Sequence, residues 1–331
     1  MNSRQLVQAI FSHKNSGANA LWLGMPHLET EEIYLSETGL SDMEQLSQHL
    51  GSDCRWYSAC SSYQHPSGSP MFDTAYGARH AFAEYTDDDI GKLDEFPWPD
   101  PGYNNYDAIL AKLTAQPDKA LFSGFWCHYF HILCDLFGME EYFVKMYTDP
   151  ALVEAVTERV LAYFEISMNE FLPQAGDLFD VVFFGNDFGT QADLLVSPEG
   201  FAQFILPGVK RITAIAKKHG KRVMLHSCGS IYKVIPKLID AGIDALHPLQ
   251  ARARNMDADT LAREFKRDLV FCGGVDTQEL LVTGSPAQVA DQVHRLRSVF
   301  GENYIVSPSH ESLLPNVPFQ NVLAMCRAAK D

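Results

Sequence analysis

Short apolar runs alternate with longer amphipathic stretches along most of this chain. The stretch 150–171 repeats apolar residues at helical spacing with Asp149 before it as an N-cap, and 198–218 and 231–241 are similar, the last ended by Gly242. Strands alternating with helices predict a parallel sheet, and eight such units predict a closed (β/α)8 TIM barrel of the α/β class. The predicted strands are 20–25, 54–59, 120–125, 180–185, 222–226, 244–247, 269–272 and 304–307.

A long segment separates the second and third predicted strands. Residues 61–119 hold many aromatic and acidic side chains, including the Pro-rich stretch 96–102, which is too short and too aromatic to act as a linker. Neither an internal repeat nor a low-complexity run divides the chain. We therefore expect one barrel domain over residues 1–331, with 61–119 as a lid-like insertion over one mouth of the barrel.

The composition narrows the class of protein. A hydrophobic fraction of 46% and a net charge of -16 describe a globular chain that disfavours nucleic acid and other polyanions as partners. No stretch approaches the roughly 20 apolar residues that cross a membrane, and the N-terminus lacks a signal-peptide core. The seven cysteines are odd in number and lack a CxxC pair, so disulfides are not expected. We expect a cytoplasmic protein.

Polar side chains follow the predicted strands at the point where a TIM barrel carries its active site. The most specific pair is His226 and Cys228, because residues two apart at a strand end point to the same side and can share a metal ion. A hydrogen-bonded histidine beside an inert thiol is the alternative. Together with His310 after the eighth strand, the pair predicts a catalytic zinc site with three protein ligands and one open position.

Asp187 leaves the apolar fourth strand and is the predicted catalytic carboxylate, as a fourth ligand, a general base or an acceptor group for the substrate. Its alternative role is to cap a helix or order a loop. His247, His128 and His131 are interpreted as packing residues. Four further polar residues near these strand ends are predicted to contact substrate, the last with helix capping as its alternative: Asn186, Gln191, Gln250 and Asp276.

Several segments, in order, make the chain resemble the uroporphyrinogen decarboxylase superfamily from about residue 21 to 325. They are the acidic segment 89–101 with its Pro-Trp-Pro motif, 138–140 with 149–150, 185–191, 197–199, 225–230, 273–278 and 307–310. The superfamily contains cofactor-free decarboxylases of uroporphyrinogen and zinc methyltransferases that take a methyl group from a corrinoid. The resemblance implies one of these two activities.

The residues favour the methyltransferase branch. The decarboxylases carry an arginine-rich motif after the first strand, whereas this chain has Glu29, Glu31 and Glu32 there, which would repel a polycarboxylate. The methyltransferases carry a His-x-Cys motif that His226 and Cys228 match. Their third ligand, usually a late cysteine, is missing here, and His310 is the nearest match. A neutral imidazole in place of a thiolate leaves the metal one charge unit more positive.

The resemblance therefore implies a methyltransferase that uses zinc and a methylcobamide carried by a partner corrinoid protein. The small-molecule methyl acceptor is a thiol or tetrahydrofolate, and His310 and Asp187 are the expected catalytic residues. A homodimer is compatible with this expectation, and neither a membrane nor nucleic acid takes part. Two alternatives stay open: a decarboxylase of the uroporphyrinogen type, distinguished by metal independence, and a non-catalytic barrel that binds a corrinoid.

Overall fold

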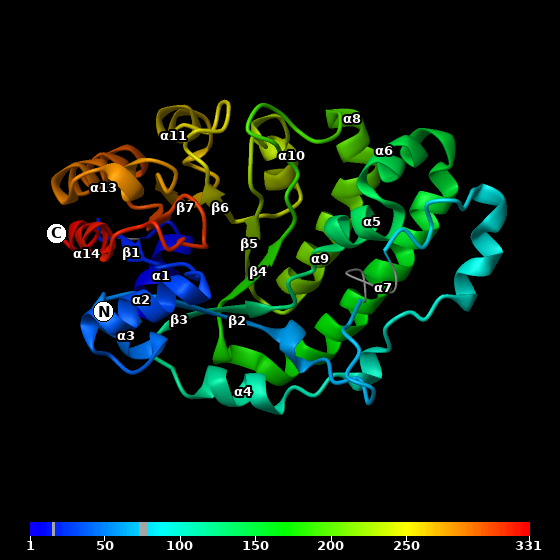
Figure 1. Cartoon of the computed structure of the whole chain (residues 1–331), viewed down its shortest axis with the longest axis horizontal. Coiled ribbons are helices and arrows are strands. Elements are labelled where there is room, and N and C mark those ends of the chain that lie inside the picture. The colour runs from blue at the N-terminus through cyan, green and yellow to red at the C-terminus, as the bar shows by residue number, and fades with distance from the viewer. Residues whose placement is uncertain (15–16, 73–78) are drawn as a thin grey trace.

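Eight parallel strands form one sheet at the centre of the molecule (Figure 1). The computed structural model describes residues 1–14, 17–72 and 79–331. Neighbouring strands pair in the order β1-β8-β7-β6-β5-β4-β3-β2, which confirms the predicted (β/α)8 barrel. The strands are β1 (Ala20–Leu21), β2 (Cys54–Ser58), β3 (Ala120–Gly124), β4 (Val181–Gly185), β5 (Arg222–His226), β6 (Ala245–Leu249), β7 (Val270–Val275) and β8 (Tyr304–Pro308).

The seam between β1 and β2 is held differently from the other strand pairs. Asp53 donates its backbone N–H to the Leu21 carbonyl at 2.8 Å, and the Asp53 carboxylate accepts the Leu21 N–H at 2.8 Å. The Asp53 side chain thus accepts a hydrogen bond that a backbone carbonyl accepts in a regular sheet. The strand β1 is also shorter than the predicted 20–25. Because both Leu21 backbone groups are satisfied, the sheet closes here without a regular ladder.

Helices surround the sheet. In Figure 1, α1, α2, α13 and α14 lie at one side of the strands, and α5, α6 and α7 lie at the other. The α-helices are α1 (Ser3–Phe11), α2 (Leu28–Thr38), α3 (Met43–His49), α4 (Asp107–Thr114), α5 (Tyr129–Phe137), α6 (Met139–Thr148), α7 (Pro150–Ala175), α8 (Pro198–Gly200), α9 (Leu206–Lys218), α10 (Ile235–Asp240), α11 (Ala258–Phe265), α12 (Leu280–Thr283), α13 (Pro286–Phe300) and α14 (Phe319–Ala328). Shorter turns are η1 (Ala59–Ser62), η2 (Asp87–Glu95), η3 (Pro101–Tyr103), η4 (Gly176–Leu178), η6 (Tyr232–Val234) and the π-helical η5 (Phe201–Ile205).

Two apolar layers explain the alternation along each strand. Outward side chains pack under the helices in one large core, and inward side chains fill the barrel together with Val7, Ile10 and Phe11 of α1. Inside, Trp22 makes edge-on contacts with Phe122 and Phe183, with ring centroids 5.4 Å apart in both pairs. The barrel is therefore a packed core with α1 at its amino-terminal end.

The start of α7 is capped by a different residue than the sequence predicts. Asp149 occupies the N-cap position but makes no side-chain cap hydrogen bond. Instead the carboxylate of Asp87 accepts the Leu152 N–H at 2.8 Å, while the Asp149 carboxylate accepts the Asp87 N–H at 3.3 Å. The hydrogen bond that caps α7 thus comes from Asp87, which lies 62 residues before Asp149 in the chain. Rules for N-caps consider only neighbouring residues and could not predict it.

The described parts of the insertion between β2 and β3 pack on the flank of the barrel. Lys145 of α6 donates to the Tyr85 carbonyl at 2.5 Å, and Tyr106 donates to the Ser167 carbonyl of α7 at 3.2 Å. Residues 73–78 of the predicted lid lie outside the described residues. That the insertion works as a lid stays a prediction.

Among the described residues, none of the helices combines the length and the apolar character that crossing a bilayer requires.

Candidate metal centre

The carboxyl ends of β4 and β5 bring three predicted site residues together. Met224 faces the barrel interior, and His226, two residues further along β5, continues that inward face. Cys228 follows two residues later, and Asp187 lies two residues beyond the end of β4. Backbone pairing of Gly185 with His226 holds these two strand ends in register. Residues 41 positions apart in the chain thus meet at one mouth of the barrel.

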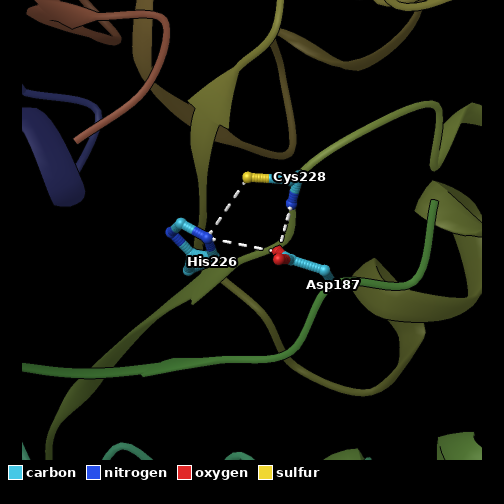
Figure 2. A group of neighbouring side chains, drawn as sticks. All are labelled: Asp187, His226 and Cys228. Atoms are coloured by element: carbon cyan, nitrogen blue, oxygen red, sulfur yellow. Dashed lines mark hydrogen bonds and ion pairs between the residues drawn. The ribbon is translucent and has the colours of Figure 1, made fainter. Parts of the chain in front are cut away.

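Figure 2 shows Asp187, His226 and Cys228 pointing toward one another. Nε2 of His226 lies 3.2 Å from Oδ1 of Asp187 and 3.5 Å from Sγ of Cys228. The Cys228 N–H donates to the same carboxylate oxygen at 2.8 Å. The His226 side chain is only 4% exposed, whereas that of Asp187 is 39% exposed. The group is therefore rigid on the β5 side and accessible on the β4 side.

The surroundings shift the pKa values of two of these groups in opposite directions. Burial would raise the pKa of Asp187, but the hydrogen bond and charge of His226 and the Cys228 N–H together lower it well below its usual range. Burial raises the pKa of the Cys228 thiol, and the carboxylates of Asp187 and Glu311 raise it further. Without a cation the cysteine is a neutral thiol, so a thiolate here requires a positive charge nearby.

The three side chains fit a zinc ion by chemistry and by spacing. Their ligand atoms all lie within 4.8 Å of one another. A tetrahedral ion with Zn–S of about 2.3 Å and Zn–N of about 2.0–2.1 Å separates sulfur from nitrogen by about 3.6 Å, close to the 3.5 Å found here. A divalent ion would also offset the carboxylate and favour the Cys228 thiolate.

His310 and Glu311 form a second group with Cys228. Their ligand atoms also lie within 4.8 Å of one another, and Nδ1 of His310 is 3.7 Å from Oε2 of Glu311. The 4.8 Å group of Asp187, His226 and Cys228 does not include His310. Nδ1 of His310 accepts the Ser312 N–H at 3.1 Å, which orients the ring. That His310 completes the metal site stays a prediction.

His247 packs inside the barrel, as the sequence indicates, and also contacts the candidate site. It is 1% exposed inside the barrel, and its Nδ1 lies 3.1 Å from Nδ1 of His226. Its ring contacts Trp22 and Phe183 at centroid distances of 4.7 and 5.3 Å. Burial lowers the pKa of His247 well below its usual range, so it is neutral. It therefore supports the second nitrogen of His226, a role that second-layer partners of metal-binding histidines commonly have.

His131 is also closer to the site than the sequence indicates. Its Nε2 accepts the Asp187 backbone N–H at 3.0 Å and lies 3.9 Å from Oδ2 of the same residue. Burial lowers the pKa of His131, although the Asp187 carboxylate opposes that shift. The signal available in the sequence was its position two residues into the helix that follows the third predicted strand. An aromatic-rich neighbourhood concealed it, because buried rings and functional rings share that composition.

Two of the four predicted substrate contacts line one cavity beside the metal-binding group. Gln250 and Asp276 border a cavity of about 400 Å³ together with Arg252 and His310. Asp276 also accepts the Gln278 N–H at 2.9 Å and pairs with Arg252 at 3.1 Å, so it orders its own loop as the alternative predicted. Gln191 donates to Gln250 at 3.0 Å. Substrate contact by Gln191, Gln250 and Asp276 stays a prediction.

Asn186 does not fit the predicted substrate contact. The residue is fully buried, its amide oxygen accepts the Phe130 N–H at 2.9 Å and its amide nitrogen donates to the Cys127 carbonyl at 3.1 Å. Both polar ends therefore bind backbone next to α5. We correct its role from substrate binding to positioning of α5, because a buried amide is stabilised by such backbone partners.

Residues 86–331 match the uroporphyrinogen decarboxylase (URO-D) family, which is more than half of the chain. The chain belongs to that family. The resemblance drawn from the short motifs is thereby confirmed. The match contains Asp187, His226, Cys228, His310 and Glu311, so the whole candidate metal centre lies within the URO-D region.

Two further comparisons find similar proteins in Methanosarcina mazei. A methylated-thiol–coenzyme M methyltransferase of Methanosarcina mazei is 25% identical over 193 residues, which are 56% of this chain and 46% of that protein. The matched region thus spans about half the length of this curated relative. A solved structure of a methyltransferase from Methanosarcina mazei superposes with a TM-score of 0.69 at 13% identity, covering 99% of this chain and 98% of the other. At that identity the second comparison supports the fold alone.

Proposed function

We propose that this protein transfers a methyl group from a methylcobamide, carried by a small corrinoid protein, to a thiol or tetrahydrofolate acceptor, with help from zinc. One observation carries the proposal: at the barrel mouth, Nε2 of His226 lies 3.5 Å from Sγ of Cys228 and 3.2 Å from the Asp187 carboxylate. Soft sulfur with nitrogen and oxygen ligands is the donor set that zinc takes in proteins.

The reaction is a nucleophilic displacement. The acceptor's sulfur or nitrogen forms the new bond to the methyl carbon, the cobalt–carbon bond breaks, and its electron pair stays on cobalt. A bound zinc ion would act as a Lewis acid that favours the deprotonated acceptor at its open position. The chain itself must hold the acceptor in line with the methyl carbon and keep water away.

Residues of the site could bind the metal ion, accept a proton and hold the acceptor. His226, Cys228 and His310 would hold the ion, and Asp187, 39% exposed, is a carboxylate able to accept the proton that the acceptor loses. Its lowered pKa makes it a weak base in the free site. A zinc ion would lower the pKa of a thiol acceptor bound to it, so a weak base would be enough to take the proton. The cavity beside His310 is the proposed acceptor pocket.

The comparisons support the class of reaction. The curated relative at 25% identity is a methyltransferase, and its name gives a methylated thiol and coenzyme M as its substrates. The URO-D family also contains the decarboxylase that gives it its name. The short acidic turn that opens α2, with Glu29 and Glu31, favours the methyltransferase reaction, because it offers no cation to a polycarboxylate.

The test is a methyl-transfer assay with purified protein. Methylcob(III)alamin is mixed with the zinc-loaded protein and with a panel of thiols or tetrahydrofolate, and the loss of the cobalt–methyl absorbance is followed together with the methylated product. We expect enzyme-dependent transfer to at least one acceptor, abolished by a chelator. Uroporphyrinogen is tested in parallel. Its decarboxylation at enzyme-like turnover, unaffected by the chelator and without methyl transfer, would contradict the proposal.

A further inference from the structure

Glu311 holds a buried carboxylate oxygen without a hydrogen-bond partner. Its Oε2 has no access to solvent and accepts no hydrogen bond, although the side chain as a whole is 17% exposed. Two imidazole nitrogens, Nδ1 of His226 and Nδ1 of His310, lie 3.6 and 3.7 Å away. A buried carboxylate oxygen that accepts no hydrogen bond is costly, so this position favours a cation.

The fold keeps Glu311 at this place. The Met25 N–H donates to its carbonyl at 2.8 Å, which ties the loop after β8 to the loop after β1. Gly24 makes that contact possible, since a Cβ there would lie 2.5 Å from the Glu311 carbonyl oxygen. These contacts hold the backbone of Glu311 in place, and the side chain is only 17% exposed.

The charge of the site also favours a second anionic ligand. A zinc ion held by His226, Cys228 and His310 would keep a net charge of +1, because only the thiolate is negative. Asp187 is already engaged by His226 and by the Cys228 N–H. Glu311 is the second carboxylate in contact with the group, and its ligand atom lies within 4.8 Å of those of Cys228 and His310.

We infer that Glu311 is a ligand of the metal ion that Cys228 binds, and that it supplies the negative charge which a second thiolate would otherwise bring. The inference rests on the proposed metal site but not on methyl transfer. It makes the centre harder, with one sulfur and at least one carboxylate oxygen among its ligands, and electrically neutral, because Cys228 and Glu311 would each supply one negative charge.

The test measures metal binding directly. Wild type, Glu311→Gln, His310→Ala and the control Glu32→Gln, which makes the same change at an exposed residue of α2, are loaded with Zn²⁺ or Co²⁺. Chelator competition gives the affinity, and the visible spectrum of bound Co²⁺ reports the ligands. Circular dichroism melting shows whether each variant is folded. Glu311→Asp, which keeps the charge, serves as a second variant should Glu311→Gln not fold.

We expect Glu311→Gln to lose more than about 100-fold in affinity, beyond the 10–100-fold that outer partners cost, and to change the Co²⁺ spectrum. Glu32→Gln should match wild type in both. If Glu311→Gln leaves the Co²⁺ spectrum unchanged, Glu311 is not a ligand and the inference is overturned. If wild type binds neither metal, the inference and the zinc part of the proposed function fail together, whereas methyl transfer is judged by its own assay.

Discussion

Single residues at the mouth of the barrel differ in how their charge is balanced. Asp187 accepts hydrogen bonds from His226 and from the Cys228 N–H, so its negative charge is stabilised in the free protein. Glu311 has no such donor. His247 and His131 carry lowered pKa values because of burial, so they add imidazole rings without adding charge. This combination places an anionic carboxylate beside neutral imidazole rings, a site whose positive charge a metal ion would supply.

The largely buried His128 predicts acid sensitivity of the fold. Burial lowers its pKa to about 4, and its Nδ1 has no hydrogen-bond partner. The unfolded chain takes up this proton below its usual pKa of about 6.5, whereas the folded chain does so only near 4, so stability falls as the pH drops through this window. Between pH 7 and pH 5 we expect His128 to account for a loss of about 2 kcal/mol.

Urea unfolding of His128→Gln at the two pH values measures this contribution. The variant should lose about 2 kcal/mol less than wild type on acidification, whereas His49→Gln, at an exposed histidine of α3, should behave as wild type does. Equal losses in wild type and His128→Gln would show that His128 titrates normally in the folded protein.

At the scale of the elements, strand positions were readable from the sequence, whereas contacts between distant loops were not. All eight predicted strands exist, because apolar runs buried on both faces give a clear signal. The spacing of His226 and Cys228 likewise predicted that both side chains face one site. Glu311 was not predicted from the sequence, because its position depends on a contact with the loop after β1. Asn186 was misjudged because only the structure shows its backbone partners.

The conformation of the loop that carries Cys228 depends on Gly229. It has a φ of +82°, and a Cβ there would lie 2.3 Å from the Gly189 carbonyl oxygen. Gly229→Ala must push the loop after β5 away from the loop after β4, which separates Cys228 from Asp187. Gly220 has a similar φ of +70° but open space around it, so Gly220→Ala is the matched control.

We expect Gly220→Ala to lose about 1 kcal/mol of stability from backbone strain alone, and Gly229→Ala to lose more. Only Gly229→Ala should also lose metal affinity, by about tenfold or more, as misplaced ligands do. Thermal melting and chelator competition on both variants decide the matter. Equal metal affinity in the two would show that the Cys228 loop tolerates the displacement.

For the whole molecule, the barrel explains how residues from 187 to 311 meet at one place. Parallel strands end at the same edge of the sheet, so each βα unit adds its own side chain to one mouth. The net charge of -16 makes the molecule acidic as a whole and disfavours polyanionic substrates. A metal ion and a partner-bound methyl donor are compatible with such a surface, because neither requires a cluster of free cations.

The metal content of the purified protein tests the central claim most directly. After dialysis, zinc is quantified per chain in wild type and in Cys228→Ser, and methyl transfer is measured on the same samples. The proposed zinc site predicts about one zinc per chain in wild type, removable by chelators, and loss of both metal and activity in Cys228→Ser. Wild type and Cys228→Ser that are both free of metal and equally active would contradict it.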